Sequence, residues 1–188
     1  MIDHTNKFIF VHIGKTGGTS IEHTLNPNVN KSQSVKTQGN TEFKGKHWVA
    51  SNYKRKYRDI FDLYFKFTFV RNPWELEVSL CKWFEMIGDN KFRPFKQHIN
   101  RRQGNMGFTR FMCDKKGNNL LDFIGRFENL QQDFNTICDK IGIPKQTLPH
   151  INPTKHKHYT EYYDEETKQI VAEKYAKDIE YFGYEFGE

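Results

Sequence analysis

Short apolar runs separated by glycine-rich or polar stretches recur along the chain, and three of them predict strands. Lys7 to Ile13 (KFIFVHI) and Tyr64 to Val70 (YFKFTFV) are largely apolar and rich in Phe, Val and Ile. Continuous apolar character over such a length predicts a strand covered on both faces of a sheet. Leu120 to Phe127 (LLDFIGRF) returns to this character and predicts a third strand.

Apolar residues spaced three and four positions apart predict three long helices. The first follows Asn72 and Pro73, which suit a helix cap and first turn, and ends near Gly88. The second is stopped by Gly142 and Pro144. The third begins at Asp164 and runs towards Gly183, with acidic residues at its positive end. The three apolar faces are Leu76, Leu80, Trp83 and Ile87; Leu130, Phe134, Ile137 and Ile141; and Val171, Tyr175 and Ile179.

Three further segments complete the predicted order. Asn26 to Gly45 is polar without an apolar period, which predicts a long loop. His47 to Tyr57 predicts a short helix, and Asp89 to Asn119 is the least regular stretch, which we expect to be an acceptor-binding insertion. Strands alternating with helices predict an α/β fold, a single domain over residues 1–188 with a mainly parallel central sheet flanked by helices. In such sheets, ligands bind at the carboxyl ends of the strands.

Composition supports one domain with an aromatic core. The chain has 188 residues, of which 36% are hydrophobic and 15% are Phe, Trp or Tyr, so aromatic rings must supply much of the buried area. Its three cysteines lack a CxxC spacing, which gives little support to a disulfide framework or a zinc site. No apolar run approaches the roughly 20 residues of a membrane span. Because no secretion signal is visible either, we expect a cytoplasmic location without a membrane partner.

A glycine turn follows the first predicted strand and opens a helix. Residues Gly14 to Ser20 (GKTGGTS) would present backbone N–H groups, a helix dipole and the Lys15 ammonium to an anion. The glycines would let the backbone approach that ligand, and the hydroxyls of Thr16, Thr19 and Ser20 would add donors. The alternatives are a plain surface turn and the P-loop of a nucleotide kinase. A kinase loop needs a glycine where the chain has Ile9.

Two motifs then resemble one enzyme family. His12 to Ser20 (HIGKTGGTS) is similar to the 5′-phosphosulfate loop of the carbohydrate sulfotransferases, which include the Golgi enzymes that sulfate heparan and chondroitin and their bacterial relatives. The usual loop has Pro or Gln where this chain has Gly14. Phe69 to Trp74 (FVRNPW), followed by Ser79, resembles the family's 3′-phosphate-binding segment. GRFENL from Gly125 and the tail from Leu148 to Tyr184 also look like this family, so the resemblance spans nearly the whole chain.

The resemblance implies the P-loop-like sulfotransferase fold and 3′-phosphoadenosine 5′-phosphosulfate (PAPS) as the sulfuryl donor, with 3′-phosphoadenosine 5′-phosphate (PAP) as product and no metal. The acceptor would be a hydroxyl of a saccharide, with a small metabolite or a protein tyrosine as the alternatives. The resemblance assigns the 5′-phosphosulfate to Lys15, Thr16, Gly17, Gly18, Thr19 and Ser20. It assigns the 3′-phosphate to Arg71 and Ser79, and it places Arg126 and Phe127 near the adenine.

Catalysis needs positive charge on the leaving oxygen and a base for the acceptor proton. Lys15 is the candidate for the charge. His47 is the favoured base, because related enzymes carry a histidine at the start of a short helix between the two motifs, and histidine titrates near neutral pH. His12 is the rival base, although its place in a strand favours a structural role. Lys155, with His156 and His158, closes over the nucleotide, meets an anionic acceptor or forms a solvated loop.

A different class of function remains open at this point. The formal charge of +6 favours an anionic partner, and the run from Lys54 to Arg58 (KRKYR) has the composition of a nucleic-acid-binding surface. A charge run of this kind is usually a solvated helix face, and no RNA-binding signature accompanies it. We therefore expect no nucleic-acid partner.

Overall fold

The structure is a computed structural model that describes residues 1–26, 37–38, 41–42, 48–89, 92–101, 107–151 and 156–188. It divides the chain into two compact units. Unit 1 comprises Met1–Val70 and Phe108–Ile151, and unit 2 comprises Arg71–Gly107 and Asn152–Glu188. The segment 89–119 is therefore shared between the two units, and the single domain over residues 1–188 stays a prediction.

Unit 1 is built on one six-stranded sheet in the order β3-β4-β1-β2-β5-β6. Its central strands β2, β5 and β6 are parallel, with Phe10 opposite Phe67 and Val70 opposite Arg126. Strands β1, β4 and β3 extend the sheet in antiparallel pairs. The strands are β1 (Ile2–Asp3), β2 (Phe8–Phe10), β3 (Thr37–Gln38), β4 (Thr41–Glu42), β5 (Phe65–Val70) and β6 (Phe123–Arg126).

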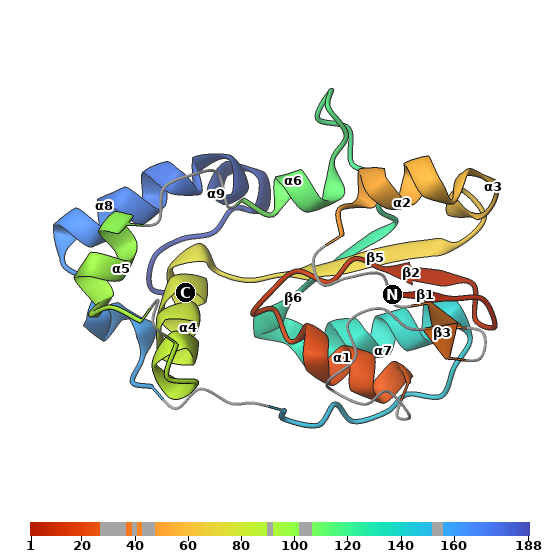
Figure 1. Ribbon diagram of the computed structural model, residues 1–188, viewed down its shortest axis with the longest axis horizontal. Coiled ribbons are helices and arrows are strands. Elements are labelled where there is room, and N and C mark those ends of the chain that lie inside the picture. The colour runs from red at the N-terminus through yellow and green to blue at the C-terminus, as the bar shows by residue number, and fades with distance from the viewer. Residues whose placement is uncertain (27–36, 39–40, 43–47, 90–91, 102–106, 152–155) are drawn as a thin grey trace. The chain divides into compact units, whose positions relative to one another are not determined.

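Helices cover both faces of this sheet, as Figure 1 shows: α1 and α7 lie on one side, and α2 and α3 lie on the other. The helices of unit 1 are α1 (Gly18–Leu25), α2 (Ala50–Lys56), α3 (Arg58–Phe61), α6 (Thr109–Met112) and α7 (Leu130–Ile141), with a 3₁₀ turn η1 (Phe127–Asn129). This arrangement confirms the predicted α/β class, with helices flanking parallel central strands.

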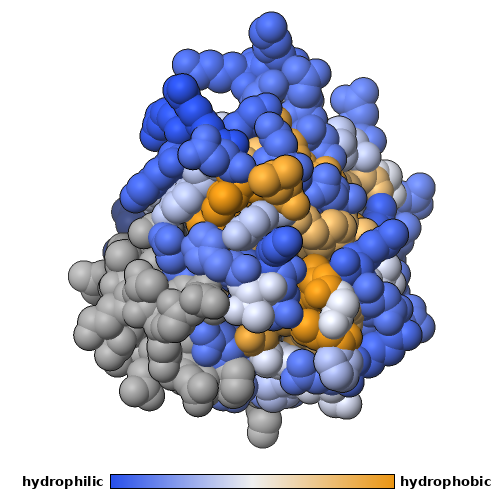
Figure 2. Space-filling model, turned by 90° about the vertical axis from the view of Figure 1, so that its right-hand side faces the viewer, coloured by the Kyte–Doolittle hydropathy of each residue, from blue (hydrophilic) through white to orange (hydrophobic). Residues whose placement is uncertain are grey.

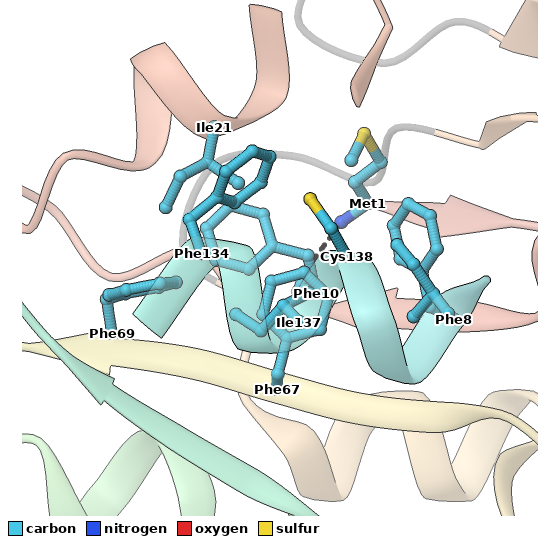
Figure 3. Packing of buried hydrophobic residues seen from close by; sticks show 10 residues of the cluster. Met1, Phe8, Phe10, Ile21, Phe67, Phe69, Phe134, Ile137 and Cys138 are labelled. Carbon is cyan, nitrogen blue, oxygen red and sulfur yellow. Dashed lines mark hydrogen bonds between the residues drawn. The ribbon is translucent and has the colours of Figure 1, made fainter. Parts of the chain in front are cut away.

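The core of unit 1 lies between the sheet and the helices α1 and α7. Phe10 and Phe67 stack with ring centroids 5.0 Å apart, and both are fully buried. Figure 3 shows these rings facing Phe134 and Ile137 from α7. Every residue of β5 from Lys66 to Val70 is buried, as expected for a strand covered on both faces. Aromatic rings therefore supply much of the core, as the composition predicts.

Unit 2 consists of helices. They are α4 (Pro73–Met86), α5 (Phe95–Arg101), the 3₁₀ turn η2 (Tyr159–Tyr162), α8 (Glu165–Lys174) and α9 (Ala176–Phe182). Asn72 caps α4 by accepting a hydrogen bond from the Trp74 N–H, and Pro73 occupies the first turn, as predicted. Asp164 caps α8 in a reciprocal capping box with Thr167. Both helix starts were therefore readable from the sequence.

Two expectations about segments are wrong in the described residues. The predicted loop from Asn26 to Gly45 contains β3 and β4, which pair with each other and with β1. The predicted final helix is two helices, because Tyr175 leaves helical geometry between α8 and α9 (φ −108°, ψ 17°). Tertiary pairing defines β3 and β4, and no local pattern reports it.

The least regular stretch, 89–119, contains the short helices α5 and α6. Its role on the acceptor side stays a prediction.

The face of α4 that is buried also differs from the predicted one. Leu76 is buried as expected, but Ile87 is 46% exposed, while the polar residues Glu77 and Ser79 are buried. Glu77 can be buried because both of its carboxylate oxygens have partners. One oxygen lies 2.9 Å from His98 Nε2, and the other accepts a hydrogen bond of 2.8 Å from the Tyr175 hydroxyl. A buried carboxylate with these partners is compatible with the interior, so hydropathy alone misplaces the face.

The surface drawn in Figure 2 is mainly hydrophilic, with a smaller group of hydrophobic residues reaching it. Leu63, in the turn after α3, is 76% exposed and is the most exposed large hydrophobic side chain of the described residues. Single apolar residues at a surface are ordinary and need no partner.

Candidate functional site

The turn between β2 and α1 is the best-defined candidate site of unit 1. Residues 14–17 form the turn, and α1 starts at Gly18. Two of its residues have left-handed backbone: Gly17 with φ 79°, and Lys15 with φ 67°. Left-handed residues turn successive N–H groups to one side and create concavities that bind anions. The first turn of α1 has neither an acidic residue nor a side-chain cap, so no carboxylate of that turn faces its N–H dipoles.

Lys15 is the notable residue of this turn because left-handed backbone is costly for a residue with a Cβ. Such a conformation costs of order 1–3 kcal/mol and persists only where the surrounding structure fixes it, often at functional sites. The Lys15 side chain is half-buried. The loop therefore holds an ammonium group on a strained backbone at the start of a helix.

The glycines of this turn serve packing inside the protein. A Cβ on Gly17 would lie 2.8 Å from Leu130 Cδ2 at the start of α7, and a Cβ on Gly18 would lie 2.4 Å from the imidazole of His12. The nearest atoms to each Cβ position are side chains of the protein itself, so packing alone requires these two glycines. The expectation that they also let the backbone approach a ligand stays a prediction. Close contact with Leu130 also places the start of α7 against the loop.

The three hydroxyls of the loop have different environments. Thr16 is fully buried and donates to the Ile13 carbonyl over 2.8 Å, so its hydroxyl closes the turn. Thr19 is exposed. Ser20 is 6% exposed; its hydroxyl accepts from the Ile151 N–H over 3.4 Å, and its own N–H donates to the Gly17 carbonyl over 3.0 Å. Thr19 therefore offers the hydroxyl most open to an incoming anion.

His12, the rival base, is held from two sides. Its Nδ1 lies 2.9 Å from a carboxylate oxygen of Glu22 on α1, and its ring stacks on Phe10 with centroids 5.7 Å apart. The opposite edge of the His12 ring lies against Gly18. This environment joins strand to helix, which favours the structural role expected for His12. Glu22, which the sequence analysis did not single out, completes this link.

Arg126 is the last residue of β6, and Phe127 begins the 3₁₀ turn η1 directly after it. The backbone N–H of Arg126 donates to Asp133 of α7 over 2.6 Å, and both predicted residues are half-buried. Gly125, just before them, lies so close to Phe69 that a Cβ would come within 2.5 Å of the ring. Because α7 touches Gly17 as well, the structure brings this turn and the glycine loop to the same helix start.

Unit 2 contains the second predicted anion-binding pair. The Arg71 guanidinium is nearly buried and meets Glu75 at two points, Nη2 to Oε1 at 2.9 Å and Nε to Oε2 at 3.2 Å. Such a two-point pair fixes the plane of the guanidinium. Ser79 lies two turns further along α4 and is 2% exposed. Glu75 was missed by the sequence analysis, although its position four residues after Arg71 on a helix is a readable signal.

Two predicted residues, His47 and Lys155, lie outside the described residues. The neighbours of Lys155 are described: His156 Nδ1 lies 2.7 Å from the Lys157 carbonyl, and His158 Nδ1 lies 2.7 Å from the Thr160 hydroxyl. His158 is exposed. The role of this basic cluster stays a prediction.

Comparison with known proteins supplies the family. The Sulfotransferase family matches over residues 1–112 and 76–185, which together cover nearly the whole chain and both units. The chain belongs to the sulfotransferase family. It is also similar to an uncharacterized protein of Archaeoglobus fulgidus, with 29% identity over 115 residues that cover 60% of this chain and 94% of that protein. No solved structure matches.

Membership of the sulfotransferase family indicates a transferase that moves a sulfuryl group. Within the described ranges, no three His, Cys, Asp or Glu side chains gather in a way that could hold a metal ion. None of the helices built from described residues has the length and apolar character needed to cross a membrane.

Proposed function

We propose that the protein transfers the sulfuryl group of PAPS to an acceptor hydroxyl of a carbohydrate and releases PAP. The observation that carries this proposal is the turn 14–17, with left-handed backbone at Lys15 and Gly17 before an uncapped helix, in a chain of the sulfotransferase family. The residues fit the group, because the turn offers N–H dipoles and an ammonium without a carboxylate in the first turn of α1.

Each predicted residue then has a role in binding or proton transfer. Lys15 and the N–H groups of the turn hold the 5′-phosphosulfate, and Lys15 neutralises the charge that develops on the leaving phosphate oxygen. Thr16, Thr19 and Ser20 shape this end of the site. Arg71 and Ser79 bind the 3′-phosphate, Arg126 and Phe127 lie along the adenine, and Lys155 is the proposed contact to the nucleotide from the tail of the sequence.

The chemical step is a displacement at sulfur. The acceptor oxygen forms a bond to sulfur while the bond between sulfur and the phosphate oxygen breaks, and the acceptor proton passes to a base. His47 is the proposed base, since a neutral imidazole accepts a proton near physiological pH. PAP leaves with the electrons of the broken bond.

Charge on α2 and α3 supports an acidic saccharide as the acceptor. Lys54, Arg55, Lys56 and Arg58 are all exposed, and none of the four forms an ion pair with a carboxylate of the described residues. Lys56 lies 5.6 Å from the ring centroid of Trp48, which adds an aromatic surface of the kind that stacks on sugars. Unpaired exposed cations favour association with a polyanion and make it sensitive to salt.

The first experiment is calorimetric titration with PAP in the absence of metal. We expect micromolar binding by the wild type, weakened at least about tenfold in Lys15→Ala and in Arg71→Ala, because each substitution removes a charge-assisted contact. Lys140→Ala, which removes an exposed lysine from α7, is the matched control and should bind PAP normally. No PAP binding together with magnesium-dependent ATP binding would instead support a kinase.

The acceptor is tested separately. Lys54→Glu combined with Arg58→Glu should raise the KM for an acidic saccharide while leaving PAP affinity unchanged, whereas neutral saccharides should be unaffected. RNA that binds in a salt-sensitive manner and is not displaced by PAP would favour a nucleic-acid-binding module.

A further inference from the structure

Asn72, the residue between the Arg71 guanidinium and helix α4, uses both ends of its buried side-chain amide. It is 1% exposed. Its Oδ1 accepts from the Trp74 N–H over 3.1 Å, which caps α4, and its Nδ2 donates to the Glu185 carbonyl over 2.9 Å. Capping needs only the oxygen, and Ser, Thr or Asp would supply it equally well. The nitrogen therefore has a second task, which is to hold the segment 184–188.

Phe186 anchors that segment in an aromatic cage. Its ring makes edge-to-face contacts with Trp74, Tyr159 and Tyr163 at centroid distances of 5.6, 5.6 and 5.5 Å, and Lys168 Nζ lies 4.9 Å from its centroid. Edge-to-face aromatic pairs add stabilisation beyond the area that they bury. Three such contacts fix the ring position of one residue.

The cage is itself tied to the first turn of α4 by hydrogen bonds. The Tyr163 hydroxyl donates to the Trp74 carbonyl over 2.8 Å, and the Trp74 indole N–H donates to the Lys168 carbonyl over 3.1 Å. Burial raises the pKa of the Tyr163 hydroxyl far above its usual range, so this donor keeps its proton at every working pH. Trp74, in the first turn of α4, is thus bonded to Tyr163 and Lys168, the residues that also contact the Phe186 ring.

We infer that the segment 184–188 is a strap that positions the backbone from Arg71 to Trp74, here called the Arg71 turn, for binding of the 3′-phosphate. Asn72 and Phe186 are its positioning residues. This inference rests on the proposed function, in which Arg71 binds that phosphate. Arginine loses much rotational freedom when it binds an anion, and a turn held in place before binding lowers that cost. Glu75 orients the guanidinium plane, and the strap orients the backbone that carries it.

The experiment compares two nucleotides in two strap variants. Asn72→Ser keeps an oxygen for the cap and loses the donor to Glu185, and Phe186→Ala empties the cage without touching the Arg71 turn. Tyr181→Ala removes an exposed ring of α9 outside the cage and is the matched control. Each variant is titrated with PAP and with adenosine 5′-phosphosulfate, which lacks the 3′-phosphate.

We expect both strap variants to lose about tenfold in affinity for PAP, equivalent to about 1.4 kcal/mol, while their affinity for adenosine 5′-phosphosulfate stays at the wild-type value. In an Arg71→Ala background, the strap substitutions should cause no further loss of PAP affinity, because they act through Arg71. Binding of adenosine 5′-phosphosulfate by the same samples reports that the protein is folded.

Equal losses for the two nucleotides, or a full additional loss in the Arg71→Ala background, would show a general structural role and overturn the strap. Unchanged PAP affinity in both strap variants would overturn it as well, while leaving the proposed function intact. Failure of the wild type to bind PAP would remove the proposed function, and the strap with it.

Discussion

The two units hold their candidate anion sites by different means. In unit 1 the candidate site is formed by backbone groups. They belong to a four-residue turn, which contains two left-handed residues, and to the start of α1. In unit 2 it is a side chain, Arg71, whose place depends on Glu75 and on buried polar contacts between helices. A backbone site is encoded within a few consecutive residues, whereas a side-chain site requires partners far along the chain.

The largest effect should follow from breaking the buried polar network of unit 2. Glu77→Ala leaves His98 and Tyr175 without their shared partner, and we expect a loss of about 3–5 kcal/mol in the free energy of unfolding. Urea denaturation measures the loss, and hydrogen exchange should show lower protection in α4, α5 and α8 with β2 and β5 still protected. Tyr175→Phe removes one hydroxyl and should cost about 1 kcal/mol. A smaller loss in Glu77→Ala than in Tyr175→Phe would refute the contrast between the units.

A smaller effect should follow from adding one methyl group to the loop of unit 1. The Cβ of Gly18→Ala would lie 2.4 Å from the His12 ring, so the ring or the helix must move, at a cost of about 1–3 kcal/mol. Thermal unfolding with PAP titration on the same samples measures both consequences. His12→Ala should rescue Gly18→Ala by vacating the space, and Thr19→Ala at the exposed neighbour should change stability little. Without that rescue, the steric explanation is wrong.

Lys15 offers a finer test of the backbone site. Glycine accepts left-handed backbone and alanine does not, so Lys15→Gly should be more stable than Lys15→Ala by about 1 kcal/mol. Both substitutions should weaken PAP binding to a similar degree, because both remove the ammonium. Chemical denaturation and calorimetry on the pair separate strain from charge. Equal stabilities would show that the loop relaxes in these variants.

The smallest expected effect concerns the thiol of Cys81. Burial raises its pKa to about 11, and its Sγ donates to the Arg93 carbonyl. A raised pKa means that the folded state retains the proton, so this thiol contributes stability below about pH 9 that is lost as pH rises towards 11. At pH 8 a thiol reagent should modify Cys81 only after unfolding, as measured by mass spectrometry against a Cys81→Ser control. Rapid modification in the native protein would contradict its burial.

The parts of the fold that the sequence predicted are those with local causes. The strand β5, the capped start of α4, the helix α7 with its apolar face and the strand-turn-helix at Lys15 all follow from residues within one or two turns of each other. The strands β3 and β4 were missed because two-residue strands in a polar segment have no periodicity, and only pairing with β1 defines them. The break at Tyr175 was missed because the apolar period of Val171, Tyr175 and Ile179 continues across it.

By itself, the sequence determined the α/β class, the sulfotransferase resemblance and the residues proposed to meet the nucleotide, since backbone propensity, capping and motif spacing act over short distances. Only the tertiary structure decided that Gly18 makes room for His12, that Glu77 lies in the interior, and that Phe186 and Asn72 join the chain's last described residues to the turn of Arg71. Such contacts link residues as far apart as Asn72 and Glu185. Their energies depend on burial and on satisfied partners, and neither is visible in a local pattern.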